Sequence, residues 1–393
     1  MIIKKRIKLG IFGDDLCRRG KGTSVVLQNL VREYTNLLKE EIDLSLICRE
    51  NIRGNLDYPK VRLILVKIFR LPKLSGFFSY LYFFLFTKEE FDIIHFPRPA
   101  LHPFFGILKL LGKTKKIVVT FHGAPENDKI PLYQNFFNRF NRSFIRYIGQ
   151  YFIDAAVADS RSGAEQIAGY YGINKKKITT IYLAAGDSFK PLMVGEKDAA
   201  RRMLKDKYSI FEPYILSVSR LDPHKNIHRL AQAFLDLKEK EKIPHKLVLV
   251  SAKHDPEYSK IVYDIVKNSP YAPEICFMPF VEEDYLRFLY SLADVFVYVS
   301  LSEGFGLPLV EAMKCGTPIV TSNISCMPEI IGDAGVLVDP WRFNTISRGI
   351  IDVLRDEGLK STLKERGLRR SEQFSWESSA KAYLNLYENC LRN

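Results

Sequence analysis

SEGFGLPLVEAM (Ser302–Met313) places two glutamates, Glu303 and Glu311, eight positions apart, with two glycines and a proline between them. The preceding run, ADVFVYVS (Ala293–Ser300), is apolar and rich in β-branched residues, which is typical of a buried parallel strand. Pro308 suits the first turn of a helix, where its missing N–H costs nothing. The sequence therefore predicts a strand, then a glycine loop, then the start of a helix.

This loop suits a ligand that carries both phosphates and hydroxyls. Free N–H groups at a helix start favour an anion, and glycines let a ligand approach the backbone closely. Glu303 would lie in the loop and Glu311 about one turn into the helix, where both could accept sugar hydroxyls. A hydrolase acid–base pair is the less suitable interpretation, because Glu311 near the positive end of a helix serves better as an acceptor. We expect a nucleotide sugar.

A second loop of the same kind is SVSRLDPHKN (Ser217–Asn226), which follows one predicted strand and precedes a helix. Arg220 offers a planar permanent charge and Lys225 a mobile one, a common pair for neutralising a diphosphate. Negative charge grows on a nucleoside diphosphate as it leaves, so cations held there stabilise the transition state more than the ground state. A charged surface loop without function is the alternative.

Two motifs in the first half are candidates for the same chemistry. VVTFHGAP (Val118–Pro125) ends a predicted strand with His122, at the carboxyl edge where such sheets bind ligands; a structural histidine is the alternative. RRGKGTSVV (Arg18–Val26) fits neither the P-loop nor the G-x-G-x-x-G pattern, which argues against a dinucleotide dehydrogenase. Its glycines, Gly22 among them, still predict a loop that a ligand can approach. No His, Cys and Asp cluster has metal-ligand spacing, so we expect no metal.

Strand-like and helix-like segments alternate through residues 1–190, and the alternation restarts from about Pro213. A polar connection, AAGDSFKPLMVGEKD (Ala184–Asp198), separates the two series. We therefore predict an α/β fold of two doubly wound, Rossmann-like domains facing a cleft, residues 1–190 and 191–374. Residues 375–393 are predicted to form one closing helix that packs back towards the N-terminal domain.

Composition and charge narrow the class of protein. The chain has 393 residues, six cysteines without a C-x-x-C pair, and a first stretch without a signal-peptide core, so we expect a cytoplasmic protein with reduced thiols. The net charge of +13 comes from the first half: residues 1–190 contain 31 Lys and Arg against 17 Asp and Glu. This asymmetry predicts an acidic partner such as an anionic membrane or a phosphorylated acceptor, with nucleic acid less expected. A general solubility bias is the alternative.

Two aromatic stretches raise the question of a membrane. FFSYLYFFLF (Phe77–Phe86) is too short to span a bilayer. The segment Pro131–Phe152 carries Arg139, Arg142 and Arg146 among Phe, Tyr and Ile at near-helical spacing. It could lie in a membrane interface, or it could cover the sheet of its domain with its arginines in solvent.

Taken together, these motifs resemble the retaining glycosyltransferases of family 4, which have the GT-B fold. EGFGLPLVEAMKCGTPIV matches the E-x7-E signature of that family almost position for position, and SRLDPHKN, TFHG and PEIIGDAGVLVDP are similar to its other motifs in the same order. The likeness is strong from about residue 150 onward and diffuse before it. Ser219 and AAGD (Ala184–Asp187) depart from the family pattern, and the first loop is unusually basic.

The resemblance implies roles for particular residues. Glu311 would bind the ribose hydroxyls, Glu303 and His122 the transferred sugar, and Arg220 and Lys225 the diphosphate. The backbone of Gly304, Phe305, Gly306 and Leu307 would lie nearby, and Gly22 would meet phosphate or acceptor.

The activity implied is metal-independent transfer of a hexose, mannose favoured, from a GDP- or UDP-sugar with retained configuration. The acceptor would be a saccharide or a lipid-linked saccharide in polysaccharide or cell-envelope synthesis, and the enzyme would be cytoplasmic or peripheral on the inner membrane face. Two other classes fit less well: a nucleotide-sugar 2-epimerase of related fold, and a catalytically silent protein that binds saccharide or nucleic acid.

Overall fold

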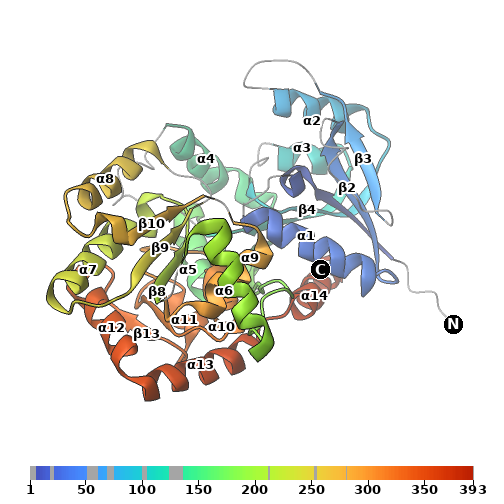
Figure 1. The fold of residues 1–393 in the computed structure, drawn as a ribbon. Helices are drawn as coiled ribbons and strands as arrows, with labels where there is room; N and C mark the ends of the chain where they lie inside the picture. Colours follow the sequence, from blue (N-terminus) through green and yellow to red (C-terminus); the bar gives the residue numbers. More distant parts are fainter. Residues whose placement is uncertain are drawn as a thin grey trace. The chain divides into compact units, whose positions relative to one another are not determined.

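The computed structural model describes residues 6–17, 22–50, 61–68, 75–99, 104–123, 136–210, 213–251, 255–279 and 281–392. The chain divides into two compact units, each with its own sheet (Figure 1). Among the described residues, unit 1 contains those up to Leu183 together with Trp376–Arg392, and unit 2 contains Ala184–Ser375.

Unit 1 is built on a parallel sheet with the strand order β3-β2-β1-β4-β5-β6-β7. Its strands are β1 (Ile7–Phe12), β2 (Ile42–Arg49), β3 (Arg62–Val66), β4 (Phe91–Phe96), β5 (Thr114–Phe121), β6 (Ala155–Ala158) and β7 (Ile178–Thr180). Its α-helices are α1 (Gly22–Asn36), α2 (Ser75–Phe86), α3 (Phe104–Leu110), α4 (Phe136–Tyr147), α5 (Arg161–Tyr171) and α14 (Trp376–Arg392). Short 3-10 turns are η1 (Asp14–Cys17), η5 (Gly149–Tyr151) and η6 (Lys175–Lys177).

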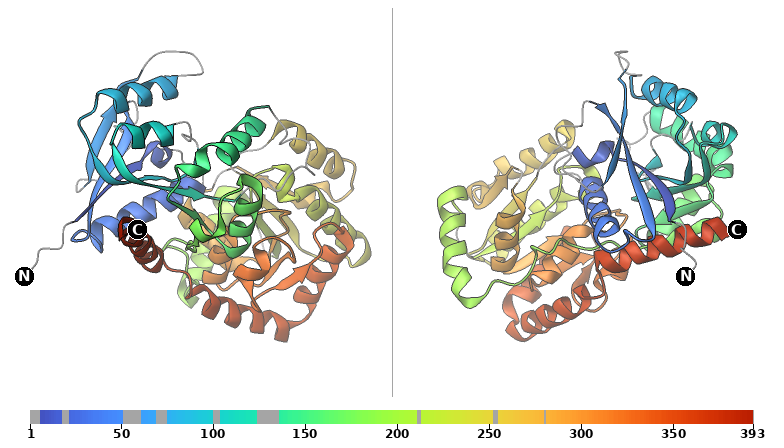
Figure 2. Two further views of the ribbon diagram at one scale, coloured as in Figure 1. Left: turned by 180° about the vertical axis from the view of Figure 1, so that it is seen from behind. Right: turned by 90° about the vertical axis from the view of Figure 1, so that its right-hand side faces the viewer.

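Helices cover both faces of this sheet. On one face an aromatic core joins Tyr80 and Phe84 of α2 and Phe104 of α3 to Phe12 and Phe96 on the strands. On the other face α14 runs beside α1, as Figure 2 shows, and the Tyr34 and Tyr387 hydroxyls of these two helices are 3.2 Å apart. The last helix of the chain is therefore part of the core of unit 1.

Unit 2 repeats the design with the order β10-β9-β8-β11-β12-β13. Its strands are β8 (Tyr214–Val218), β9 (Lys246–Val250), β10 (Ile275–Met278), β11 (Val295–Tyr298), β12 (Ile319–Ser322) and β13 (Val336–Val338). Its helices are α6 (Val194–Tyr208), α7 (Ile227–Lys240), α8 (Pro256–Lys267), α9 (Glu283–Leu292), α10 (Leu307–Lys314), α11 (Met327–Ile331), α12 (Phe343–Arg355) and α13 (Glu357–Ser371), with 3-10 turns η7 (Pro223–Lys225) and η8 (Ala272–Glu274).

Both sheets confirm the predicted α/β class with two doubly wound arrays. In each sheet the strand order reverses next to the first strand, between β1 and β4 in unit 1 and between β8 and β11 in unit 2. Ligands of such sheets bind outside the carboxyl ends of the strands at that point. The strand pairs that frame it are therefore where a site is expected.

The connection between the arrays differs in detail from the sequence prediction. The structure groups residues 184–190 with unit 2, and α6 begins at Val194, inside the stretch expected to be a linker. The reason is packing within unit 2: the ring of Phe189 lies 5.9 Å from that of Tyr290, and Lys314 donates a hydrogen bond of 3.2 Å to the carbonyl of Gly186.

Candidate functional site

The loops after β8 and β11 lie together at the carboxyl edge of the unit 2 sheet. The two strands pair in parallel, with Ile215 opposite Val295 and Leu216 opposite Phe296. The loop after β8 carries Arg220 and Lys225, and the loop after β11 carries Glu303 and the glycines. A backbone hydrogen bond of 2.7 Å from the Leu301 N–H to the His224 carbonyl joins the two loops. This is the switch point of the sheet, so the fold delivers both motifs to one place.

At the centre of these loops, Lys225, Glu303 and Tyr298 form a buried triad. Lys225 Nζ lies 2.5 Å from Glu303 Oε1, and the two side chains are only 13% and 12% exposed. Lys225 Nζ also donates to the Tyr298 hydroxyl at 2.9 Å, and that hydroxyl donates to Glu303 Oε1 at 2.8 Å. Burial would raise the pKa of Glu303, but the Lys225 ammonium lowers it below its ordinary value. The triad is therefore a charged pair with one bridging hydroxyl.

The loop after β8 contains one neutral histidine beside its two cationic side chains. Burial, together with the neighbouring Lys225 ammonium, lowers the pKa of His224 to about 4, so this ring is neutral near pH 7. Arg220 is paired with Asp222 of its own loop and its side chain is 46% exposed. The structure thus places Arg220 in the predicted loop with a carboxylate partner that the sequence prediction did not include.

Asn226 shapes the end of this loop. Its φ of 61° is left-handed, a conformation that asparagine tolerates better than most residues. Its buried amide donates to the carbonyls of Val299 at 3.0 Å and Pro340 at 2.7 Å. These bonds hold the residue next to Lys225 against Val299, which follows β11, and Pro340, which follows β13.

The glycine loop ends at α10 in the way the sequence predicts. Gly306 has a φ of 87° and precedes the helix, and Pro308 lies in the first turn. Glycine adopts this conformation readily, and a Cβ there would meet Leu309 Cδ1 at 3.2 Å. The Phe305 side chain is buried against Phe374, with ring centroids 5.6 Å apart, so this residue can offer only its backbone to a ligand.

Glu311 lies in the second turn of α10, and its Oε2 accepts a hydrogen bond of 2.8 Å from the Tyr290 hydroxyl. Burial raises the pKa of Glu311 to about 7, although the Tyr290 hydrogen bond opposes the shift. The carboxyl group therefore changes charge near neutral pH. A group that titrates there and has a defined donor is typical of a binding site.

The other two predicted residues belong to unit 1. His122 follows β5, and its Nδ1 lies 2.8 Å from Oδ2 of Asp159, which follows β6. Gly22 is the exposed first residue of α1. Unit 1 therefore also presents a polar group at the carboxyl edge of its central strands.

Sequence reasoning missed Tyr298, Tyr290 and Asp159. Tyr298 is the last residue of β11 and Asp159 directly follows β6, so a polar side chain at the carboxyl end of a strand is the signal that could have found both. In the part of the chain that the structure describes, no group of three His, Cys, Asp or Glu residues could hold a metal ion. No described helix is long and apolar enough to cross a membrane.

Known families match both units. Residues 203–370 match the family model described as glycosyl transferases group 1, and residues 20–184 match the model described as glycosyltransferase family 4. The O-antigen chain mannosyltransferase B of Escherichia coli is 32% identical over 213 residues, 54% of this chain and 54% of that protein. The serotype-specific mannosyltransferase WbdA of Escherichia coli is 33% identical over 242 residues, 61% of this chain and 29% of that protein. The match thus spans about half of one relative and less than a third of the other.

The fold matches that of solved structures along nearly the whole chain. The HepE protein of Anabaena, in complex with UDP and glucose, superposes with a TM-score of 0.79 at 15% identity, covering 98% of this chain and 100% of that one. The sucrose-phosphate synthase of Thermosynechococcus elongatus gives a TM-score of 0.77 at 19% identity, covering 98% and 99%. At these identities the likeness concerns the fold.

Proposed function

This chain belongs to the group 1 glycosyl transferases of glycosyltransferase family 4, with the GT-B fold, and we propose on that premise that it transfers a hexose from a nucleotide diphosphate carrier to a saccharide acceptor. The observation that carries the proposal is the buried Lys225–Glu303 pair at the switch point of unit 2, directly before the start of α10. The pair combines an ammonium group that can bind a phosphate with a carboxylate that can accept a hydrogen bond from a sugar hydroxyl.

The geometry suggests how the donor is held. Lys225 and Arg220, with the N–H groups at the start of α10, would bind the diphosphate, which gains negative charge as the bond to the sugar breaks. Glu303 would accept hydroxyls of the transferred sugar, and Glu311 those of the ribose. Lys225 lies against Glu303, so the phosphate and the sugar would be bound by adjacent side chains.

The chemical step that fits this arrangement is a front-face transfer. The acceptor hydroxyl attacks the anomeric carbon from the side that the diphosphate leaves, a phosphate oxygen takes the acceptor proton, and the configuration is retained. The described residues of unit 2 offer cations for the leaving group, and the reaction needs no protein nucleophile. We propose that it needs no metal ion, so transfer after dialysis against EDTA should equal that of untreated enzyme; a loss restored by a divalent cation would reject this part.

Mannose is the sugar that the relatives favour, because both Escherichia coli relatives are named mannosyltransferases. We therefore propose GDP-mannose as the donor and a cell-envelope or polysaccharide chain as the acceptor. A thermal-shift panel of GDP, UDP, ADP and CDP should show the largest stabilisation with GDP. A larger shift with UDP would reject mannose while leaving the transfer chemistry in place.

Transfer itself is tested by product analysis with a sugar nucleotide and a saccharide acceptor. Arg220→Ala should lower transfer by roughly 10²-fold or more, since the leaving diphosphate loses a cation. Arg348→Ala is the matched control, because Arg348 is 78% exposed on α12 and pairs only with Asp352 in its own helix among the described contacts. Unchanged transfer in Arg220→Ala would reject the site, and an isomerised nucleotide formed without acceptor would identify a 2-epimerase.

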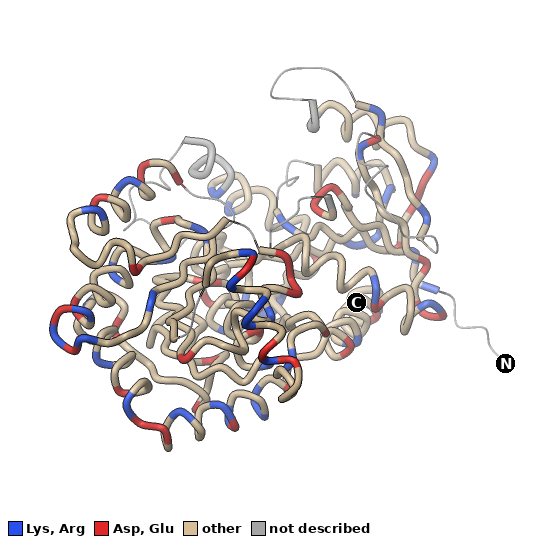
Figure 3. The backbone as a smooth tube through the Cα atoms, in the orientation of Figure 1, with Lys and Arg blue, Asp and Glu red and all other residues tan. Residues whose placement is uncertain are grey.

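We also propose peripheral contact of unit 1 with an anionic membrane, motivated by the excess of Lys and Arg in residues 1–190. Figure 3 shows basic and acidic residues interspersed along the described part of unit 1, so the excess forms no single stripe in that view. The described end of the Pro131–Phe152 segment is α4 and the turn after it, where Tyr147 and Tyr151 are 70% and 73% exposed.

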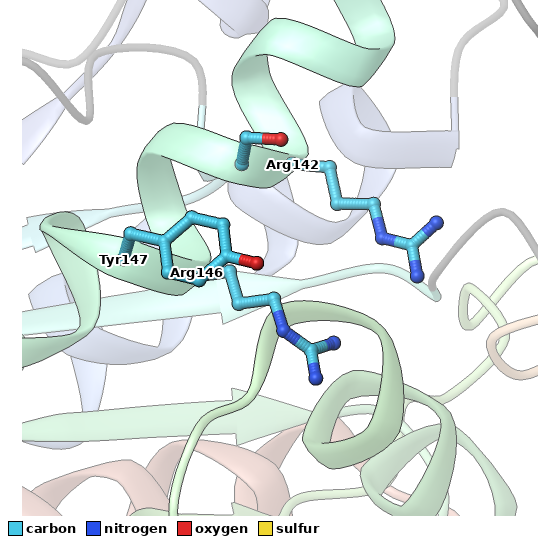
Figure 4. A pocket seen from close by; sticks show the side chains of 4 residues that line it. Arg142, Arg146 and Tyr147 are labelled. Carbon is cyan, nitrogen blue, oxygen red and sulfur yellow. The ribbon is translucent and has the colours of Figure 1, made fainter.

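Arg142 and Arg146 of this segment have a structural task. Together with Ser143 and Tyr147 they line a hollow of about 340 Å³, shown in Figure 4. Arg146 donates to the Gly169 carbonyl at 3.1 Å and Arg142 to the Tyr170 carbonyl at 3.3 Å, so both hold the C-terminal end of α5. A membrane test should therefore leave them intact. Flotation should carry wild type with anionic but not neutral vesicles, and Tyr147→Ser with Tyr151→Ser should weaken it; equal flotation with both lipids would reject the contact.

A further inference from the structure

His122 and Asp159 are partners because of strand register in unit 1. β5 and β6 pair in parallel with Phe121 opposite Ala158, so the residues that follow the two strands come to lie side by side at the carboxyl edge. His122 Nδ1 and Asp159 Oδ2 are 2.8 Å apart. The Asp159 side chain is 2% exposed and that of His122 is 19% exposed, so water screens their attraction weakly.

The Asp159 carboxylate is buried beside the start of a helix. The next residue, Ser160, caps α5 by accepting a hydrogen bond of 2.9 Å from the Gly163 N–H, so the carboxylate stands just before the positive end of a helix. Its second oxygen, Oδ1, is buried and accepts no hydrogen bond from any residue that the structure describes. His122 is therefore the group that offsets the burial of this charge.

Among the described residues, other groups that face His122 and Asp159 come from η1, from the segment after β4 and from α14. Asp15 of η1, which pairs with Arg98 at 2.6 Å, adds negative charge near the ring, and the Pro97 carbonyl also favours its protonated form. Burial alone would lower the pKa of His122. The nearby acceptors, above all the Asp159 carboxylate, raise it by more, so the pKa lies above the ordinary value. Tyr383 of α14 faces Asp159 with a hydroxyl whose pKa is raised, foremost by burial, so it stays neutral.

His95 of β4 provides an internal comparison. Its ring nitrogens are hydrogen-bonded to the Thr120 and Tyr387 hydroxyls, both at 2.8 Å. Burial, together with the nearby His122, lowers the pKa of His95 to about 3. The pKa of His95 is thus lowered and that of His122, at the end of the neighbouring strand, is raised. The Asp159 carboxylate beside His122 accounts for the difference.

We propose that Asp159 is a positioning residue for His122, whose ring it fixes at the carboxyl edge of unit 1 and holds in the protonated form. The catalytic consequence rests on the proposed function: His122 would meet the transferred sugar as an oriented cation with a fixed ring. The structural part of the inference concerns the protein alone and can be tested without any substrate.

The test is a histidine titration by NMR on the full chain labelled with ¹³C-histidine, from about pH 5 to about pH 9. The chain has seven histidines, and His122→Gln identifies the resonance of interest. In wild type the midpoint of His122 should lie above the usual value of about 6.5, and in Asp159→Asn it should fall by at least about one unit. A wild-type midpoint at or below about 6.5 overturns the proposal without any variant at Asp159. The test therefore remains decisive even if Asp159→Asn fails to fold.

Asp154→Asn is the matched control at the opposite end of β6. The Asp154 carboxylate pairs with Lys109 at 2.7 Å and accepts from the Ile117 N–H at 2.7 Å, so it is as firmly bonded as Asp159 but lies away from His122. This control should leave the His122 midpoint unchanged. An equal shift in both variants would show a general loss of structure and overturn the positioning role.

Kinetics separate the two proposals. If the transfer reaction is found, its decline at alkaline pH should move to lower pH in Asp159→Asn and stay in place in Asp154→Asn. If no transfer is found, the proposed function fails, while the NMR titration still decides the role of Asp159.

Discussion

Glu311 changes charge near neutral pH, because burial raises its pKa to about 7. A carboxylate accepts a ribose hydroxyl more strongly than a protonated carboxyl does. Nucleoside diphosphate affinity, measured by calorimetry, should therefore increase from about pH 6 to about pH 8 in wild type. Glu311→Gln should bind more weakly and lose that increase; the same pH slope in both proteins would contradict the assignment.

The same group predicts a stability effect of opposite sign. Its pKa is raised in the folded state, so the protonated form is favoured there, and stability is lost as pH rises from its ordinary value through about 7. Across that window the loss for this single carboxyl should approach about 3 kcal/mol. Urea unfolding at several pH values should show it in wild type, and Glu311→Gln should flatten the curve.

Tyr298 tests the triad with the smallest possible change. Tyr298→Phe removes only the hydroxyl that bridges Lys225 and Glu303 at 2.9 and 2.8 Å. Stability should fall by about 1–3 kcal/mol, because two buried groups lose a partner, and kcat should fall by about tenfold or more. Tyr263→Phe is the control on α8, where the ring is 43% exposed. Equal kcat in Tyr298→Phe and wild type would show that the hydroxyl only supports the fold.

At the scale of an element, α10 begins at the proposed donor site and ends away from it. Gly306 before the helix and Gly316 after it have φ values of 87° and 71°, so alanine at either position should cost about 1–2 kcal/mol of stability. Only Gly306→Ala should also weaken nucleotide binding, by about tenfold, because only that end belongs to the proposed donor site. A thermal-shift titration of both variants decides this, and equal weakening would place the nucleotide elsewhere.

Sequence patterns located the elements well where periodicity was local. A strand was predicted within Ala293–Ser300, and β11 is observed there at Val295–Tyr298, because an apolar, β-branched run before a glycine loop admits few alternatives. Contacts between side chains of different loops were harder to predict from the sequence. Lys225 and Glu303 were each proposed from their own motif, but their contact across 78 positions depends on β8 pairing with β11. Tyr298 and Asp159 were missed for the same reason, since their roles follow from strand register.

The start of α6 shows where composition is a poor guide to secondary structure. Ala184–Asp198 was expected to be a linker from its polar, Gly- and Pro-containing composition, yet a helix begins at Val194. The Glu196 carboxylate accepts a hydrogen bond from the Met193 N–H at 2.9 Å and pairs with Arg287 of α9 at 2.9 Å. A charge partner more than ninety residues away settles the conformation, and composition alone could not show it.

At the scale of the whole molecule, unit 1 is completed by the last helix of the chain. Tyr383 and Tyr387 of α14 are fully buried and bond to Thr120 at 2.9 Å and to His95 at 2.8 Å. A chain that ends at Ser375 would leave these polar groups of β4 and β5 without their partners. We expect unit 1 of that chain to become sensitive to limited proteolysis.

Unit 2 holds Arg220, Lys225, Glu303 and Glu311, so the shortened chain should still be stabilised by the nucleotide that stabilises wild type. Tyr387→Phe in the full chain is the mild control: it removes one hydroxyl shared by Tyr34 and His95 and should cost about 1–3 kcal/mol without exposing unit 1 to protease. Thermal shift and proteolysis on the three proteins give the answer together. Protection of unit 1 in the shortened chain would mean that α14 only covers the sheet, and loss of the nucleotide response would mean that the units do not fold independently.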